Sequence, residues 1–307
     1  MPSYLPRLFQ MALSTSFSRA PLCIEDRVHV FGMEGGADDA TIRSFGEEWA
    51  KFSRFSDTDL RTAGEELFDL WPAELDPATT RLLDLGCGSG RWTRYLAHRV
   101  AHADAVDPSE AVFHAAQANA DLPKVRWSHA RGEELPFAEE SFDIIMCIGV
   151  LHHVRDPRRV LAETLRTLRA GGWFYFYLYY AMEQRGRLYR WLHRASELLR
   201  WPIHRLPGAM KRPLCDVLAV LIYLPLVLLA RLAKALGVPW WHRLPLAYYH
   251  NKSFRLMRND ALDRFGTAYE QRSTQAEITT LLHDAGFDEV RFSSQPPYWH
   301  GTARKPA

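Results

Sequence analysis

Residues 82–90 read Leu82-Leu83-Asp84-Leu85-Gly86-Cys87-Gly88-Ser89-Gly90, an apolar run that ends in three glycines at alternate positions. Glycines at this spacing let the backbone turn sharply and approach a ligand with no Cβ in the way. A dinucleotide-binding loop needs a further glycine three residues after the second one. That position holds Arg91, which would crowd a pyrophosphate. The spacing therefore favours a ligand that has no diphosphate.

Short apolar runs alternate with helical stretches on both sides of this loop, a pattern typical of βαβ units in a parallel sheet. The expected strands are residues 81–85, 103–107, 124–128, 142–148 and 173–180, and the expected helices are residues 91–100, 109–120 and 156–169. We expect Gly171-Gly172 to close the last helix, since glycine is favoured just past a helix C-terminus. Later, Thr274-x-x-Glu277 predicts a capped helix, and residues 287–292 and 298–303 predict two final strands.

The composition is that of a folded protein, because 47% of the 307 residues are apolar and 24% are charged, both close to globular averages. Disordered and fibrous classes are therefore excluded. The cysteines lie far apart and form no CxxC pair, which argues against a disulfide framework or a cysteine-based zinc site. They are Cys23, Cys87, Cys147 and Cys215. We expect a reducing, cytoplasmic location and no metal site.

The N-terminal part of the chain has a helical apolar pattern from residue 38 to residue 70. Its apolar positions recur at three- and four-residue steps, at Ile42, Phe45, Trp49 and Phe52. We expect these aromatic side chains to lie over the edge of a ligand cleft or of the core.

The small net charge of +2 conceals an uneven distribution. Residues 181–252 contain twelve Lys and Arg against three acids, so this segment carries 12 − 3 = +9 and the rest of the chain carries 2 − 9 = −7. A basic block therefore interrupts an acidic protein.

Within the basic block, residues 185–200 predict an amphipathic helix and residues 217–230 form an uncharged apolar stretch. At about 1.5 Å per residue, this stretch spans about 21 Å, too little for a bilayer core of about 30 Å. The basic residues, the apolar stretch and Trp240-Trp241 fit a segment that lies in an anionic membrane interface. A helical lid over a substrate cleft, with solvated arginines, explains the same residues, and the two interpretations are compatible. Nucleic acid is the least favoured partner, because the apolar stretch offers no phosphate contact.

The glycine loop and its surroundings resemble the class I S-adenosylmethionine-dependent methyltransferases. That family has an acid two residues before the first glycine, where this chain has Asp84. The ubiquinone-biosynthesis-like (Methyltransferase type 11) subgroup resembles it most, through Glu133-Glu134-Leu135-Pro136-Phe137, Ser141-Phe142-Asp143 and Val150-Leu151-His152-His153-Val154. The resemblance covers residues 71–180 closely and residues 274–305 more weakly.

This resemblance implies an α/β fold: a Rossmann-like, mostly parallel sheet of seven strands flanked by helices. The patterns described above add an N-terminal helical cap and a helical insert after the fifth strand. We expect four parts within one interrupted domain. They are the N-terminal segment and cap (1–75), the cofactor-binding core (76–180), the basic apolar insert (181–255) and the C-terminal completion of the core (256–307).

The resemblance also implies S-adenosyl-L-methionine as cofactor. Asp84 is expected to face the methionine moiety above the backbone of the loop, and Asp107 to bind the ribose hydroxyls at the end of the second strand. A carboxylate that accepts from two hydroxyls is a strong and selective contact. The remaining expected contacts are Gly86, Gly88 and Gly90 in the loop, Pro108, Ser109, Gly132 and Glu133 around the adenine, and Ile148 at the end of the fourth strand.

One position departs from the family pattern. The family has an acid that accepts from the adenine amino group, and this chain has Arg131 there. Arginine cannot accept a hydrogen bond. Either Glu133 takes over that contact, or the backbone alone meets the amino group.

His152 and His153 follow the fourth strand, at the edge of the sheet where ligands bind in open α/β folds. Histidine titrates near neutrality, so either one is a candidate general base if the acceptor must lose a proton. Since adjacent side chains diverge, we expect only one to face the cleft, and we favour His153. Packing at the strand end is the alternative for both residues.

Two other patterns are set aside. Gln295-Pro296-Pro297-Tyr298 is similar to the motif of DNA amino-methyltransferases, but it lies at the wrong place in the chain, where a turn is expected. Cys147 could suggest a nucleophilic cysteine, but its apolar neighbours predict a buried strand end.

The sequence thus predicts methyl transfer from S-adenosylmethionine to a small lipophilic or natural-product acceptor, on oxygen. The alternatives are an RNA methyltransferase that uses the basic insert, and a catalytically silent, membrane-associated scaffold of the same fold. The expected location is the cytoplasm, with membrane association left open, and the oligomeric state is not predicted.

Overall fold

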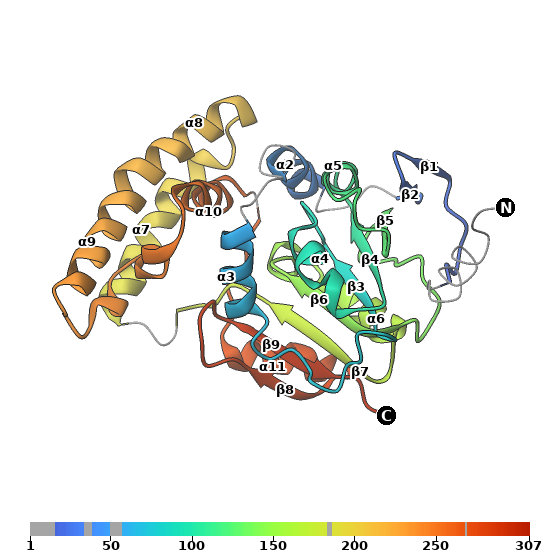
Figure 1. Cartoon of the computed structure of the whole chain (residues 1–307). Coiled ribbons are helices and arrows are strands. Elements are labelled where there is room, and N and C mark those ends of the chain that lie inside the picture. Colours follow the sequence, from blue (N-terminus) through green and yellow to red (C-terminus); the bar gives the residue numbers. More distant parts are fainter. Residues whose placement is uncertain (1–15, 34–38, 50–56, 183–185, 268) are drawn as a thin grey trace. The chain divides into compact units, whose positions relative to one another are not determined.

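The computed structural model describes residues 16–33, 39–49, 57–182, 186–267 and 269–307 (Figure 1). The chain divides into two compact units. The first unit comprises Met1–Ala181 and Glu270–Ala307, and the second comprises Met182–Tyr269. The second unit ends later than the insert expected at 181–255, because α10 (Phe254–Gly266) packs on the helices of the insert. Part of the N-terminal segment, residues 1–15, lies outside the described residues.

The first unit is built on one mixed, mostly parallel sheet with the strand order β1-β2-β5-β4-β3-β6-β7-β9-β8. Five of the eight strand pairings are parallel, and the antiparallel ones lie at the two edges. The strands are β1 (Cys23–Glu25), β2 (Val28–Val30), β3 (Arg81–Leu85), β4 (His102–Asp107), β5 (Val125–His129), β6 (Phe142–Ile148), β7 (Leu168–Tyr177), β8 (Asp288–Phe292) and β9 (His300–Arg304).

The seven expected strands are all present, so the predicted α/β fold is confirmed. The expected strand number is wrong, because β1 and β2 extend the sheet to nine strands within the described part of the chain. Each of these two strands has only three residues. Such a short segment is below the length at which an alternating pattern can be recognised.

The predicted helix end at Gly171-Gly172 is also wrong. The helix α6 (Pro157–Thr167) leads directly into β7 at Leu168, and both glycines lie within that strand. The pairing of β6 with β7 shifts in register here. A Cβ at Gly172 would lie 2.8 Å from the carbonyl oxygen of Arg169. The glycines therefore serve a β-bulge, a common place for glycine in a strand.

Side chains alternate along each strand, so apolar residues project from both faces of the sheet. Helices cover both faces. Leu83 and Leu85 of β3 pack with α6 and α11 (Gln275–Asp284) on one face. Leu82 packs on the other face with α3 (Asp57–Leu67), α4 (Arg91–Leu96) and α5 (Ala111–Ala118). The helix α11 starts with the predicted capping box, in which Thr274 and Glu277 each bond to the other's backbone N–H. The helix α2 (Asp39–Trp49) lies against α5.

The second unit is helical. It contains α7 (Arg187–Ile203), α8 (Gly208–Leu218), the π-turn η3 (Ala219–Tyr223), α9 (Leu224–Ala235), the short turns η4 (Trp241–Arg243) and η5 (Ala247–Asn251), and α10. The helix α10 packs against α7 and α8. Arg258 of α10 forms an ion pair with Asp216 of α8 at 2.6 Å, and Arg264 of α10 forms one with Glu197 of α7.

The helices α8 and α9 join through η3 into one continuous helix, which corrects the length expected for the apolar stretch. Residues Met210–Ala235 form a helix of 26 residues that is long and apolar enough to cross a membrane, judged by length and composition. The sequence suggested a shorter element because the uncharged stretch is bounded by Asp216 and Arg231, which both lie inside this helix. Pro213 and Pro225 lie inside it as well. Pro225 falls just after the π-turn, where the backbone hydrogen-bond pattern has already shifted, so its missing N–H interrupts little.

Candidate functional site

The glycine loop lies at the carboxyl end of β3, between β4 and β6, where the strand order of the sheet reverses. Open α/β sheets bind their ligands at such a switch point. Gly86, Gly88 and Gly90 all have positive φ angles, of 78°, 51° and 73°. A Cβ at Gly86 would lie 2.3 Å from Val150 Cγ2, so the loop needs glycine there for its conformation and for its space.

The loop is fastened to the end of β4. The N–H groups of Gly86 and Cys87 both donate to the carbonyl of Val106, at 2.8 and 3.0 Å. The Gly88 N–H donates to Asp107 Oδ2 at 2.8 Å. These bonds hold the loop against the acid that the sequence assigns to the ribose.

Asp107 is buried and already has several hydrogen-bond partners. Its Oδ1 accepts from the N–H and the hydroxyl of Ser109, at 2.9 and 2.6 Å. Burial raises the pKa of this carboxyl. Each carboxylate oxygen accepts about two hydrogen bonds, so Oδ2 retains one acceptor position beside Gly88. A second ligand hydroxyl would reach Oδ1 only after the Ser109 hydroxyl turns away.

Asp84 is buried at the base of the loop, where its carboxylate accepts from the hydroxyl of Thr93. Burial, and to a smaller extent the nearby charge of Asp107, raise the pKa of Asp84 to about 7. Near neutral pH this carboxyl is therefore close to half ionised, and a cation bound next to it would draw it into the ionised form.

The other expected cofactor residues come from three strand ends. Pro108 follows β4, and its carbonyl lies 3.0 Å from His129 Nε2. Gly132 and Glu133 follow β5, and a Cβ at Gly132 would crowd Leu85 at 3.3 Å. Ile148 ends β6 and pairs with Tyr177 of β7.

Arg131, which stands where the family has an acid, is used in a different way. Its guanidinium forms an ion pair with Asp39 at the start of α2. The side chain thus ties the N-terminal helix to the core.

His152 and His153 lie in the 3₁₀ turn η2 (Leu151–His153) just after β6, and both are buried. Their ring centroids are only 4.1 Å apart, so the expectation that the two side chains diverge is wrong. Aromatic neighbours hold both rings: His152 stacks on Tyr179 at 3.9 Å, and His153 lies 4.8 Å from Phe45 of α2.

The imidazole of His152 is buried among aromatic rings. Among the described residues, neither ring nitrogen of His152 has a hydrogen-bond partner. Burial, His153 and Arg272 together lower the pKa of His152 well below the usual histidine value, so its imidazole is neutral at pH 7. Arg272 lies over the ring of Tyr179 at 5.2 Å and pairs with Glu270 at 2.8 Å.

Sequence reasoning missed Tyr179 and Arg272, and it expected Phe45 at the edge of a cleft or core without naming its contact with His153. Tyr177 and Tyr179 are two residues apart, which in an extended chain places them on the same side, and that was an available signal. No local pattern points to Arg272, because the whole second unit separates it from β7 along the chain.

The two patterns set aside are placed as expected. Cys147 is fully buried in β6, and burial raises the pKa of its thiol, which makes it a poor nucleophile. Residues 295–298 lie in the connection between β8 and β9. Among the described residues, no group of three or more His, Cys, Asp or Glu side chains could hold a metal ion.

Two polar groups at this loop can still bind a ligand, because Asp107 Oδ2 retains an acceptor position and Ser89 offers a buried hydroxyl. The buried hydroxyl oxygen of Ser89 has no hydrogen-bond partner among the residues that the structure describes. The model of a known family, described as a methyltransferase domain, matches residues 83–176, which run from β3 to β7. The chain contains a class I S-adenosylmethionine-dependent methyltransferase domain. S-adenosylmethionine is the methyl donor of this family.

Curated relatives of this methyltransferase domain match over part of their length. The uncharacterized methyltransferase YcgJ of Bacillus subtilis is 30% identical over 132 residues, which are 42% of this chain and 52% of that protein. The ubiquinone biosynthesis O-methyltransferase of Aromatoleum aromaticum is 31% identical over 160 residues, which are 47% of this chain and 64% of that protein. The chain thus spans roughly half to two thirds of these relatives.

Two solved structures share the fold of the methyltransferase domain at low identity. A chain of the complex between the Haloferax volcanii Trm112 methyltransferase activator and a methyltransferase has a TM-score of 0.51 at 16% identity, covering 87% of this chain and 98% of that chain. Human N-acetylserotonin methyltransferase, solved with S-adenosylmethionine, also has a TM-score of 0.51 at 16% identity, covering 85% and 57%.

The raised pKa of Asp84 leads us to expect that cofactor binding depends on pH. The cofactor carries a positive sulfonium and a positive ammonium, and either charge next to Asp84 would favour the ionised carboxylate, so we expect binding to release a proton below pH 7. We expect the affinity to rise by up to about tenfold between pH 6 and pH 8. Asp84→Asn, which keeps an acceptor for Thr93, should flatten this slope, weaken binding less than loss of Asp107 does, and lower turnover.

Calorimetric titration of S-adenosylmethionine at pH 6, 7 and 8 measures this slope in both proteins. The stability of the free protein should change with pH in the direction opposite to the cofactor affinity. Because the folded pKa lies above the unfolded one, the contribution of Asp84 to stability is lost as pH rises toward 7. An equal pH slope in Asp84→Asn would show that another group takes up the proton.

Proposed function

We propose that this chain transfers a methyl group from S-adenosylmethionine to a hydroxyl oxygen of a small, lipophilic acceptor. The observation that carries the proposal is the placement, at one edge of the sheet, of a cofactor loop and a buried histidine cluster. The loop and Asp107 end β3 and β4, and the histidines end the neighbouring strand β6.

The acceptor side of the proposal is supported by the side chains around the histidines. Phe45, Tyr177 and Tyr179 surround His152 and His153 with aromatic rings. Aromatic walls with a few polar groups suit an apolar ring that carries a hydroxyl. Relatives named as ubiquinone biosynthesis O-methyltransferases support oxygen as the methylated atom.

The chain's own residues have three tasks in this reaction. The cofactor supplies a methyl group on a positively charged sulfur, which becomes a neutral thioether when the methyl leaves. Asp107 and the loop hold the donor, and the aromatic rings orient the acceptor hydroxyl in line and keep water out. We assign His153 as the base that takes the hydroxyl proton. His152 is less suited, since its lowered pKa makes it a weak base.

The test compares the metabolites of a deletion strain with those of its parent. The parent should contain a lipid-soluble compound that is heavier than its counterpart in the deletion strain by one methylene, which is about 14 daltons for the exchange of a hydrogen for a methyl. The purified chain and S-adenosylmethionine with a labelled methyl should then label that compound in the lipid extract of the deletion strain.

The same experiment separates the alternatives. Label in RNA instead of the lipid extract would favour an RNA methyltransferase that uses the basic unit. Tight cofactor binding with no label in either fraction would favour a catalytically silent scaffold. Either result would contradict the proposed acceptor class.

We also propose that the chain works in the cytoplasm. All four cysteines are free thiols, and three of them are buried, which supports a reducing compartment. Fractionation of cells that express the tagged chain tests this location.

A further inference from the structure

One side of the helix Met210–Ala235 is apolar and open to solvent. Only 28% of its most apolar 18 residues are buried. The buried side packs within the unit through Cys215, Ala219, Tyr223, Val227 and Ala230. The exposed side, here called the outer face, consists of Val217, Val220, Leu221, Leu228, Leu229, Leu232 and Leu236.

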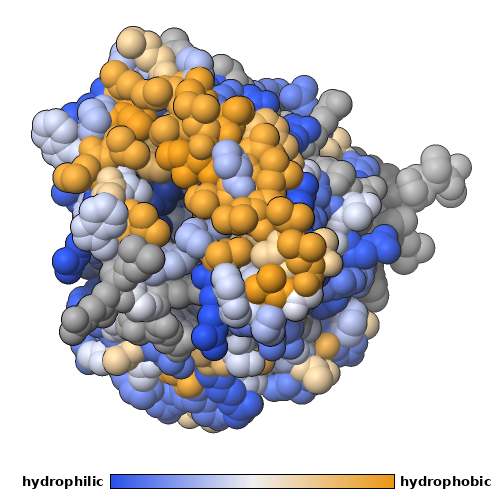
Figure 2. Space-filling view, turned by 90° about the vertical axis from the view of Figure 1, so that its left-hand side faces the viewer, coloured by the Kyte–Doolittle hydropathy of each residue, from blue (hydrophilic) through white to orange (hydrophobic). Residues whose placement is uncertain are grey.

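The outer face is a contiguous apolar patch, whereas the apolar residues of an ordinary protein surface are scattered singly. Figure 2 shows the apolar residues gathered into one broad patch rather than spread singly. Exposed Trp191, Leu198 and Trp201 on α7 and exposed Trp240 beyond α9 add to the apolar surface of the same unit. Large exposed apolar patches mark sites that bind a partner or a membrane.

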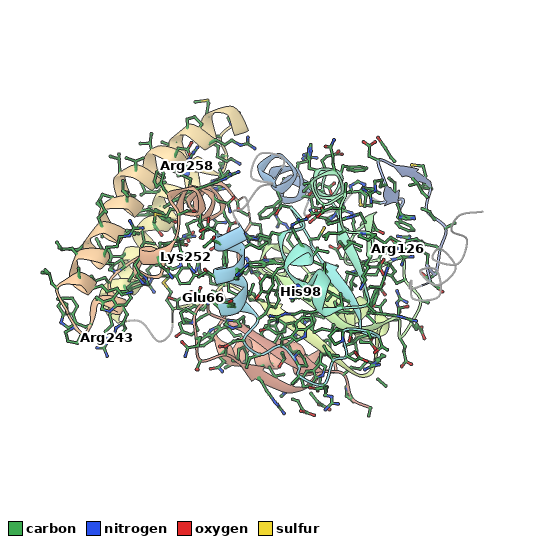
Figure 3. All side chains as sticks on the ribbon, in the orientation of Figure 1. Glu66, His98, Arg126, Arg243, Lys252 and Arg258 are labelled. Atoms are coloured by element: carbon green, nitrogen blue, oxygen red, sulfur yellow. The ribbon has the colours of Figure 1, made fainter. Side chains whose placement is uncertain are left out.

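The charge of the surrounding surface indicates which partner. From Leu198 to Asn259 there are ten Lys and Arg and one acid, Asp216, so this segment carries 10 − 1 = +9. That single acid is neutralised by Arg258 through two hydrogen bonds of 2.6 and 2.7 Å. Figure 3 labels Arg258, and Arg243 at another place in the unit, whereas the labelled Lys252 is buried. A basic apolar surface is complementary to anionic lipid.

Tryptophan and basic side chains also occur as pairs at the ends of the apolar helix. Arg205 lies over the ring of Trp201 at 4.1 Å, and Lys234 lies over the ring of Trp241 at 4.9 Å. Tryptophan and long basic side chains are the residues that settle at the headgroup level of a bilayer.

Polar contacts away from the outer face indicate how the helix lies relative to a membrane. Arg231 donates to the carbonyl of His250 at 2.7 Å, Lys234 lies 2.8 Å from His250 Nε2, and Asp216 pairs with Arg258. A helix that crossed the bilayer would carry η5 and part of α10, with these polar groups, into the hydrocarbon core, where such groups are costly. A helix that lies in the membrane plane keeps them on the aqueous side.

We propose that the outer face of α8–α9 docks on an anionic phospholipid bilayer, with the helix parallel to the membrane and its apolar side chains in the interfacial layer. The basic residues around it contact lipid phosphates. This inference goes beyond the proposed methyl transfer and does not depend on it, because binding to lipid needs neither cofactor nor acceptor.

The test is co-sedimentation of the full chain with vesicles of phosphatidylcholine alone or mixed equally with phosphatidylglycerol, at low and at high salt. We expect binding to the anionic vesicles, weakened but not abolished by salt, because screening removes the ionic part and leaves the apolar part. Release by alkaline carbonate is expected of an in-plane helix, and resistance to carbonate would overturn the orientation.

Two sets of variants separate the apolar and the ionic parts. The combined variant Leu221→Gln, Leu228→Gln and Leu232→Gln should lose the salt-resistant binding. The matched control is Leu22→Gln with Ile24→Gln, two exposed residues just before and on β1, and it should keep that binding. Arg205→Glu, Lys234→Glu and Arg243→Glu combined should weaken low-salt binding by more than about a hundredfold, at about fivefold for each charge removed near the surface. Reversal of Arg61, Lys124 and Arg159 in the first unit is the matched charge control.

Thermal melting of each variant checks that the fold is kept. Wild-type protein that stays in the supernatant with every vesicle would overturn the proposal, and a concentration-dependent dimer at the same time would show that a second copy covers the outer face. Asp107→Ala should bind vesicles as the wild type does, so a failure of the methyltransferase proposal would leave this result unchanged.

Discussion

We expect Asp107→Ala to lower the affinity of the chain for S-adenosylmethionine by at least about a hundredfold, since hydrogen bonds to a charged group contribute about 1.5–3 kcal/mol each. Two such bonds to the ribose would be lost. The Gly88 N–H and the Ser109 hydroxyl would also lose their acceptor, so the loop would be held less firmly. Calorimetric titration at pH 7.5 measures the change.

This variant needs two controls, a thermal melting experiment and a variant of an acid outside the site. Asp121, which follows α5, is an exposed acid that pairs with Arg94. Asp121→Ala should leave cofactor affinity unchanged. Thermal melting should show both variants folded. Wild-type affinity in folded Asp107→Ala would remove Asp107 from the cofactor site.

The second large effect is on turnover. We expect His153→Ala to lower kcat by about 10²–10⁴-fold, the usual contribution of a general base, with cofactor affinity unchanged. The loss should shrink as pH rises, because a hydroxyl acceptor ionises by itself in alkali. Transfer of labelled methyl into the lipid extract of the deletion strain, measured from pH 6 to pH 9, follows this dependence.

His152→Phe is the matched control for the base. It keeps a ring against Tyr179 and removes two buried nitrogens that have no hydrogen bond within the described residues, so stability should be kept or increased. Because the folded pKa of His152 is lowered, the wild type should lose stability as pH falls below about 6.5, and this variant should lose less. A turnover loss in His152→Phe equal to that in His153→Ala would contradict the assignment of the base to His153.

Local patterns predicted most of the sheet and of the cofactor side of the site. The run before Gly86, the acids at the ends of β3 and β4, and the Thr274 capping box are short-range signals, and the structure has the corresponding elements within a few residues. These features depend on backbone conformation and side-chain alternation, which neighbouring residues decide. The three-residue strands β1 and β2 had no such signal, since β1 pairs with β2 and β2 joins the sheet through distant β5.

The histidine cluster shows where local reasoning ends. His152 and His153 were found from their place after β6, but the rings around them come from α2 and from the end of β7, and Arg272 follows the second unit. The surroundings of both imidazoles depend on these segments, which are far apart in the chain. The burial that lowers the pKa of His152 is therefore a tertiary property.

The sequence by itself determined the α/β core, the glycine loop with its two acids, and the presence of a basic, apolar insert. Only the tertiary structure decided that this insert contains one continuous helix through two prolines, and that α10 and η5 cover one side of it. Hydropathy along a chain measures how apolar a segment is. It does not show which side is covered, because covering requires contacts with residues that are distant in sequence.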